Sequence, residues 1–171
     1  MGKDLRRERR KRTQRTTILL VTNGRKTEKT YLGMLKNLLR PRTGLDEYDE
    51  VWIVVDHDGT DRRPFLAACR RITQSKVFGV VSVPCFEVWL NAHYGRVRNY
   101  QNQEDAQRHY LELTGLPAKE GKSLPDDFPF DAFTRARSNS RLPGVSLPEL
   151  NAQGPCPSTT MPHLLKRLGL L

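Results

Sequence analysis

Short apolar runs alternate with amphipathic stretches over the first half of the chain. Residues 17–22, 51–55 and 77–83 are nearly continuous apolar runs that end at Asn-Gly, Asp-His-Asp-Gly and proline, as strands buried on both faces do. Residues 28–40 and 64–73 lie between these runs and carry apolar side chains at helical spacing. This β-α-β-α-β order predicts an α/β fold in which right-handed helical crossovers join parallel strands.

The second half of the chain shows no further strand pattern after residue 85. Helical spacing recurs at residues 86–94 and 103–113, and a short helix is expected at 130–137. Thr159 or Thr160 is placed to cap a last helix that runs through residue 168. This half is therefore predicted to be helix and loop.

The positive charge of the chain is unevenly placed. The net charge is +10, and residues 1–15 supply +6 of it, with eight Lys or Arg against Asp4 and Glu8. Such a block has little apolar surface to bury, so we expect a disordered arm that binds nucleic-acid phosphates. A tail that only keeps the protein in solution is the alternative. The residues expected to bind nucleic acid are Arg6, Arg7, Arg9, Arg10, Lys11, Arg12 and, after the first strand, Arg25.

These patterns divide the chain into three parts. They are a basic arm (1–15), an α/β core (16–95) and a mostly helical extension (96–171) packed on the core. The chain has no apolar run of transmembrane length, and its first residues are charged where a signal peptide needs an apolar stretch, so a cytoplasmic protein without a membrane partner is expected. The three cysteines lack a CxxC spacing, which favours reduced thiols over disulfides or a zinc cluster.

Acidic residues follow the predicted strands. Asp56 and Asp58 come after the second strand, Glu87 after the third, and Glu28 opens the first helix, while Asn23 follows the first strand. The carboxyl ends of parallel strands share one edge, so these side chains are expected to converge there. Neighbouring carboxylates repel each other unless a cation lies between them, and oxygen ligands favour Mg²⁺ or Mn²⁺. Turn capping and the helix dipole are the alternative explanations for the same residues.

Two other patterns are weaker. Residues 24–27 end like a phosphate-binding P-loop, but Leu19 stands where the first glycine of that motif belongs, which argues against nucleoside triphosphate hydrolysis. Cys85 near His93 suggests a thiol nucleophile, yet nothing in the spacing lowers the pKa of the thiol, so a buried cysteine is expected.

Taken together, these segments resemble the RloB-like family, whose catalytic core is Toprim-like. The matching parts are the basic start, ILLVTNGRKTE at 18–28, VVDHD at 54–58, SVPCFEVWL at 82–90 and PSTT at 157–160. The resemblance implies a Toprim-like α/β sheet flanked by helices and Mg²⁺-dependent cleavage of nucleic-acid phosphodiesters. It also implies a role in bacterial defence against phage, of the abortive-infection kind, beside an ATPase encoded by a neighbouring gene.

The chain departs from the family at one position. The family has Glu-Gly after the first strand, and the Toprim group uses that glutamate as a metal ligand or general acid/base, whereas this chain has Asn23-Gly24. An amide cannot take up a proton near neutral pH. Three interpretations stay open: Glu28 or Glu87 supplies the carboxylate, the protein cuts poorly, or it only binds.

The leading hypothesis is a metal-dependent nuclease that acts on DNA or RNA, tRNA included. Asp56, Asp58 and Glu28 would hold Mg²⁺ or Mn²⁺, Glu87 would complete the catalytic set, and Lys26 would approach the phosphate. The alternative is a catalytically impaired nucleic-acid-binding or sensor subunit that works with the ATPase.

Overall fold

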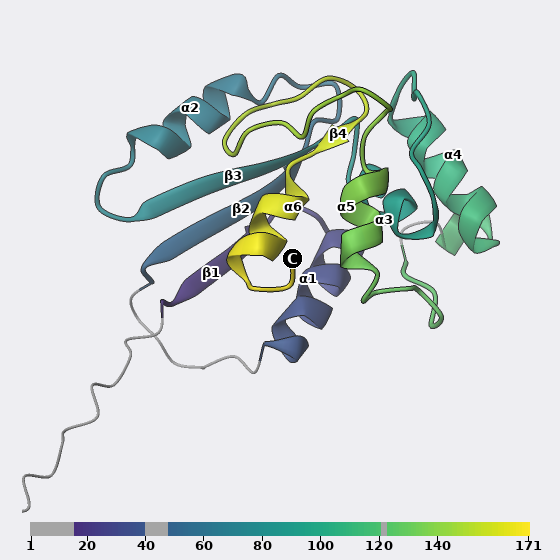
Figure 1. Cartoon of the computed structure of the whole chain (residues 1–171), viewed down its shortest axis with the longest axis horizontal. Helices are drawn as coiled ribbons and strands as arrows, with labels where there is room; N and C mark the ends of the chain where they lie inside the picture. The colour runs from purple at the N-terminus through teal and green to yellow at the C-terminus, as the bar shows by residue number, and fades with distance from the viewer. Residues whose placement is uncertain (1–15, 40–47, 121–122) are drawn as a thin grey trace, which may run out of the picture.

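A four-stranded sheet forms the centre of the protein, in a computed structural model that describes residues 16–39, 48–120 and 123–171 (Figure 1). The strands lie in the order β1 (Ile18–Thr22), β2 (Glu50–Asp56), β3 (Lys76–Val83) and β4 (Ser158–Thr159). The first three are parallel, and β4 is antiparallel to β3. The predicted α/β class with a mainly parallel sheet is confirmed.

Six α-helices flank the sheet in the described ranges. They are α1 (Thr27–Leu38), α2 (Arg63–Arg71), α3 (Glu87–Tyr94), α4 (Gln103–Thr114), α5 (Phe133–Asn139) and α6 (Met161–Arg167), with a 3₁₀ turn at Ala118–Glu120. Each predicted helix is present with ends shifted by at most three residues. Helix α4 shows the local signals most completely, since Asn102 caps its start and Gly115 ends it at a φ of 68°. None of the helices in these ranges has the length and apolar character needed to cross a bilayer.

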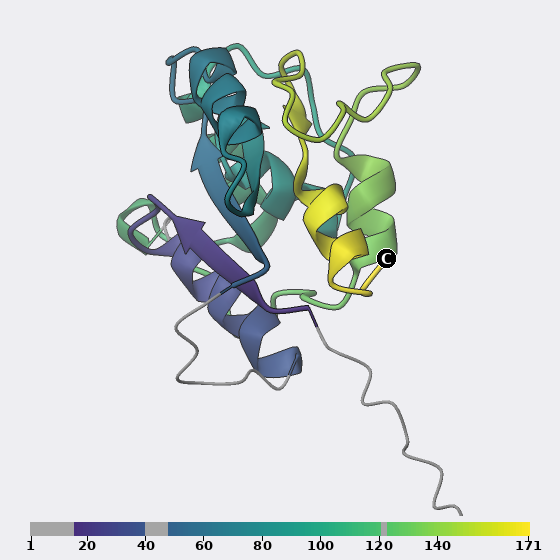
Figure 2. The ribbon, with the colours of Figure 1, turned by 90° about the vertical axis from the view of Figure 1, so that its left-hand side faces the viewer.

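The two faces of the sheet are covered unequally (Figure 2). Trp52 and Val54 of β2 point into the larger core, which α1, α3 and α6 build, whereas Val55 packs with Leu66 of α2 on the opposite face. At Gly79 of β3 a Cβ atom would overlap the Leu66 side chain, so this glycine allows α2 to pack close to the sheet.

Helices α1 and α2 therefore lie on opposite faces. The strands follow each other in one direction across the sheet, so two crossovers of the same hand would place both helices on one face. The expectation that both crossovers are right-handed is thus wrong for one of them. The position of α1 follows from its apolar stripe, because Tyr31 and Leu35 are fully buried in the larger core.

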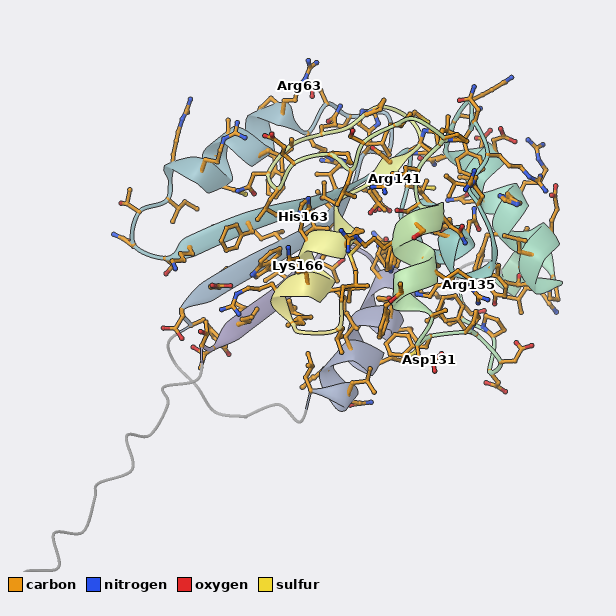
Figure 3. All side chains as sticks on the ribbon, in the orientation of Figure 1. Arg63, Asp131, Arg135, Arg141, His163 and Lys166 are labelled. Carbon is orange, nitrogen blue, oxygen red and sulfur yellow. The ribbon has the colours of Figure 1, made fainter. Side chains whose placement is uncertain are left out.

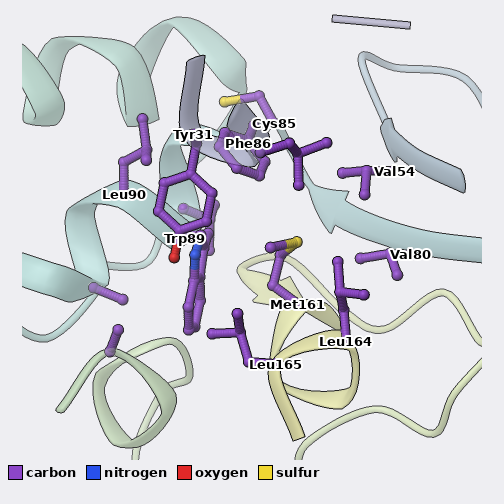
Figure 4. Packing of buried hydrophobic residues seen from close by; sticks show 14 of the residues in the cluster. Tyr31, Val54, Val80, Cys85, Phe86, Trp89, Leu90, Met161, Leu164 and Leu165 are labelled. Atoms are coloured by element: carbon purple, nitrogen blue, oxygen red, sulfur yellow. The ribbon is translucent and has the colours of Figure 1, made fainter. Parts of the chain in front are cut away.

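The larger core joins parts of the chain that are far apart in sequence (Figure 4). Met161, Leu164 and Leu165 of α6 are fully buried and pack in one cluster with Val80 of β3 and Trp89 of α3. The last helix thus depends on the parallel strands for its burial, and the strands depend on the helix.

Strand β4 was not predicted, because a two-residue strand carries no alternating pattern. Its register pairs Ser82 with Thr159, and the Val81 N–H donates to Thr160 Oγ1 at 2.9 Å. Thr160 precedes α6 as expected, but its hydroxyl binds β3 and does not cap the helix. The Thr159 hydroxyl instead accepts the Met161 N–H at 3.3 Å.

One ion pair ties α6 to the first strands. Arg167 Nε and an Arg167 terminal nitrogen donate to the two Glu50 oxygens at 2.9 and 3.0 Å, and Trp52 Nε1 donates to the same carboxylate. These donors outweigh the desolvation of the buried Glu50 and hold its pKa below the usual value.

We expect Arg167→Met to lower the free energy of unfolding by about 2 kcal/mol, roughly 4–8 °C in Tm, because it leaves a buried carboxylate without its cation. The matched control is Arg108→Met, which removes a solvent-screened pair with Asp105 and should change Tm far less. Equal effects of the two substitutions in thermal unfolding would show that the Arg167–Glu50 pair stabilises the fold no more than an exposed ion pair does.

Candidate functional site

Asp56 ends β2 at the carboxyl edge of the sheet. The residue is half-buried, and its Oδ1 atom is shielded from solvent and has no hydrogen-bond partner. Its carboxyl group is hydrogen-bonded to that of Glu28, in the first turn of α1. Burial, and then the charge of Glu28, raise the pKa of Asp56 to about 9. Without a cation, the Asp56 carboxyl group is therefore protonated at neutral pH.

The approach of Glu28 depends on Gly24. The Glu28 carboxylate lies so close to Gly24 that a Cβ atom at position 24 would overlap it. The Gly24 N–H donates to Thr22 Oγ1 at 3.0 Å, which holds the turn after β1. Gly24 of the Asn-Gly pair therefore has a structural role in the site, because it leaves room for the Glu28 carboxylate that reaches Asp56.

Glu87 opens α3 on the same edge and is buried. Burial raises the pKa of its carboxyl group, and the charges of Glu28 and Asp58 add to this effect. The thiol of Cys85 donates to the Gln103 carbonyl at 3.8 Å, and burial, with the nearby charge of Glu87, raises the pKa of that thiol. Cys85 is therefore a buried, protonated thiol, as expected, and not a nucleophile.

His93 belongs to the core. Its Nδ1 lies 3.0 Å from the Trp89 carbonyl and its Nε2 lies 3.3 Å from the Tyr31 hydroxyl. Burial lowers the pKa of the imidazole to about 4, so it is neutral at physiological pH. A carbonyl can only accept, so Nδ1 carries the proton and Nε2 accepts from Tyr31.

Asp58 does not continue the strand. It is exposed, with a φ of 46°, and its N–H donates to the Pro84 carbonyl at 3.0 Å, while the His57 N–H donates to the Ser82 carbonyl. Asp58 therefore does not continue the side-chain alternation of β2, because the turn begins directly after Asp56. Asp58 stays close enough for its charge to raise the pKa of Asp56.

A row of polar residues extends from Asp56 across the sheet. The register pairs Asp56 with Ser82 and Ser82 with Thr159, so the three residues lie side by side on neighbouring strands. The Ser82 and Thr159 hydroxyls are buried and 2.8 Å apart. The Ser-Thr-Thr run contributed to the family resemblance but had no predicted place in the site, since the pairing of β4 is not visible in the sequence.

Arg62 is a cation at the site that was not predicted. Its Nε donates to the Asp56 carbonyl at 2.7 Å, and its backbone N–H donates to Gln153 Oε1 at 2.7 Å. Its position six residues after Asp56 gives no signal, because the contact depends on how the chain turns into α2. Arg25 and Lys26 are exposed in the turn before α1.

The structure thus brings together the carboxyl groups of Asp56 and Glu28, with Glu87 and Asp58 within electrostatic reach. In the parts of the chain that the structure describes, no three Asp, Glu, His or Cys side chains form a ready-made metal cluster. The predicted arm residues Arg6, Arg7, Arg9, Arg10, Lys11 and Arg12 lie outside the described residues.

The donors at this edge are carboxylate oxygens, which are the ligands that Mg²⁺ and Mn²⁺ prefer. A buried carboxylate oxygen without a hydrogen-bond partner, beside a second carboxyl group, lacks a positive charge or a proton. Mg²⁺ is commonly bound by one or two carboxylates and completes its shell with water and substrate phosphate, so two converging carboxylates are sufficient ligands.

Comparisons with known proteins give one match. A family model described as RloB-like protein matches residues 40–168, most of the chain. No curated protein and no solved structure matches the chain significantly.

Proposed function

The chain belongs to the RloB-like family, and we propose that it is a divalent-metal-dependent nuclease that cleaves phosphodiester bonds in DNA or RNA. One observation carries the proposal: Asp56, at the carboxyl edge of a parallel sheet, has a buried oxygen without a hydrogen-bond partner and lies against the carboxyl group of Glu28. This arrangement is unfavourable for an empty structural site and suited to a cation that replaces the proton.

Asp56 and Glu28 would hold Mg²⁺ or Mn²⁺, with Asp58 reaching the ion directly or through water. The ion would supply charge neutralisation at the scissile phosphate and a water of lowered pKa. Arg62 holds the Asp56 backbone in place through its Nε. Arg25 and Lys26 would contact phosphate oxygens from the turn before α1, and Glu87 would accept a proton once substrate has changed its surroundings.

A nuclease assay on plasmid DNA, single-stranded DNA and tRNA tests the proposal. Cleavage is expected with Mg²⁺ or Mn²⁺ and is expected to stop with a chelator. Because the proposed biological role is phage defence beside an ATPase, the assay is run with and without the ATPase of the neighbouring gene. Absence of cleavage on all three substrates, with the ATPase present, would refute the nuclease proposal.

The raised pKa of Asp56 gives a pH dependence with a definite sign. A cation must displace the proton of Asp56, so the rise in Tm on adding Mg²⁺ should be small near pH 6 and grow as pH approaches about 9. Without the ion, the folded state favours the protonated form of Asp56. The stability that this protonation contributes is complete below about pH 4 and is lost as pH rises through about 9. Thermal unfolding with and without Mg²⁺ measures both, and a Tm shift independent of pH would contradict the assignment.

A second function is favoured by one position. Asn23 is exposed directly after β1. The RloB-like pattern described in the sequence analysis has a glutamate at this position. An amide there suits a subunit that binds nucleic acid, or senses it for the ATPase, without turnover.

A further inference from the structure

The excess positive charge of the chain has a second location besides the arm. Residues 16–131 contain as many carboxylates as Lys and Arg, whereas residues 132–171 contain five Lys or Arg and a single carboxylate, Glu149. The net charge of +10 is therefore divided between the arm, with +6, and this C-terminal part, with +4.

The C-terminal cations gather on two neighbouring helices. Helices α5 and α6 lie side by side in both views of the ribbon (Figures 1 and 2). Arg135 and Arg137 of α5 and Lys166 of α6 are exposed, and Arg141 follows α5. Figure 3 shows Arg135, Arg141 and Lys166 around these two helices. We call this surface the α5–α6 face.

These four cations have no carboxylate partners in the described ranges. The ion pairs there join Arg63 to Asp61, Arg98 to Glu112, Arg108 to Asp105 and Arg167 to Glu50. Neither α5 nor α6 contains an acidic residue. Asp131, just before α5, is the nearest acidic residue in sequence, and no ion pair of the described residues engages these four cations, so the face suits a polyanion.

The α5–α6 face is continuous with the attachment point of the arm. Arg167, at the end of α6, binds Glu50, and the Glu50 N–H donates to the Thr17 carbonyl at 3.1 Å. Thr17 directly follows the first described residue after the arm. Residue 16, at which the described part of the chain begins, therefore lies close to the end of α6 and to the α5–α6 face.

We propose that the α5–α6 face binds the phosphate backbone of the nucleic acid, through Arg135, Arg137, Arg141 and Lys166. The inference rests on the proposed function for its ligand and adds a surface away from the carboxylates. Phosphodiester backbones of DNA and RNA share the chemistry that this face recognises, and interactions of this kind fix the register of a strand without reading its sequence.

The test is binding by the full-length protein to labelled duplex DNA and to an RNA hairpin, in chelator, as a function of salt. The triple variant Arg135→Gln, Arg137→Gln and Lys166→Gln changes only exposed side chains. It should weaken binding tenfold or more at moderate salt. Every cation–phosphate interaction that the variant removes should reduce the log–log salt slope by about 0.9 on duplex DNA. The two probes show which nucleic acid the face prefers.

The matched control carries the same loss of charge elsewhere. Lys36→Gln, Arg71→Gln and Lys119→Gln alter exposed residues of α1, α2 and the 3₁₀ turn, and should leave the slope nearly unchanged. An equal loss in both triple variants would overturn the proposal, because net charge alone would then explain binding. So would an unchanged slope in the face variant. A wild-type protein that binds neither probe would also overturn it and would point to an acidic protein as the occupant.

The result is independent of cleavage, because binding is measured in chelator. A face variant that loses binding while the wild type never cuts would leave the surface standing and refute only the nuclease. A protein that cuts, with a slope that the face variant does not change, would refute only the surface.

Discussion

Asp56→Asn combined with Asp58→Asn should abolish Mg²⁺-dependent cleavage, with a loss of at least about 10³-fold, and should remove the rise in Tm on adding Mg²⁺. Metal-ion catalysis is worth several kcal/mol, and each 1.36 kcal/mol is about tenfold in rate. The amides keep the shape of the side chains, and asparagine tolerates the φ of 46° at position 58, so the fold should persist. Above about pH 9 the double variant should be more stable than the wild type without metal, because the carboxylate repulsion is gone.

The single variants should differ in the size of their effect. Asp56 is half-buried and its carboxyl group contacts that of Glu28, whereas Asp58 is exposed in the turn. Asp56→Asn alone should therefore reproduce most of the loss, and Asp58→Asn only about a tenfold part of it. The control, Asp126→Asn with Asp127→Asn, removes two exposed carboxylates outside the site and should leave cleavage intact. Metal-dependent cutting by the Asp56/Asp58 double variant would exclude both residues from the mechanism.

The strands and most helices of this fold are predictable because burial fixes their sequence patterns. Residues 51–55 are almost uniformly apolar because β2 is covered on both faces, and Tyr31 and Leu35 recur at helical spacing because one side of α1 is buried. Strand β4 could not be predicted, because it is too short for burial to produce a sequence pattern. Two residues held by one neighbour obtain their conformation from the register with β3, which no local pattern encodes.

The site shows the same division. The convergence of Asp56, Glu28 and Glu87 follows from one rule, that the carboxyl ends of parallel strands share an edge. The relative depth of Asp56 and Asp58 could not be predicted, since it depends on where β2 ends and the left-handed turn begins. The contact of Arg62 with the Asp56 carbonyl depends on the path of the chain into α2 and was invisible for that reason.

Asn23→Glu should accelerate cleavage by on the order of 10²–10⁴-fold, or make it appear where the wild type has none, which is the usual value of general acid/base assistance. Position 23 is exposed and adjoins Gly24, which the Glu28 carboxylate contacts, so a glutamate there would lie beside the Asp56–Glu28 pair. The added negative charge should also strengthen metal binding, seen as a larger Tm shift with Mg²⁺.

The matched control for this gain is Asn23→Gln, which has the length of glutamate but no proton acceptor and should change neither cleavage nor metal binding. The comparison separates two explanations for the wild type. If the wild type already cuts well and Asn23→Glu adds little, Glu28 or Glu87 performs the missing role. Glu28→Gln or Glu87→Gln should then be damaging, and Glu28→Gln should match Asp56→Asn, because the Asp56 and Glu28 carboxylates would hold the same cation. If neither the wild type nor Asn23→Glu cuts any nucleic acid, the carboxylate pair does not serve catalysis. The protein would then act by binding through its cationic arm and the α5–α6 face.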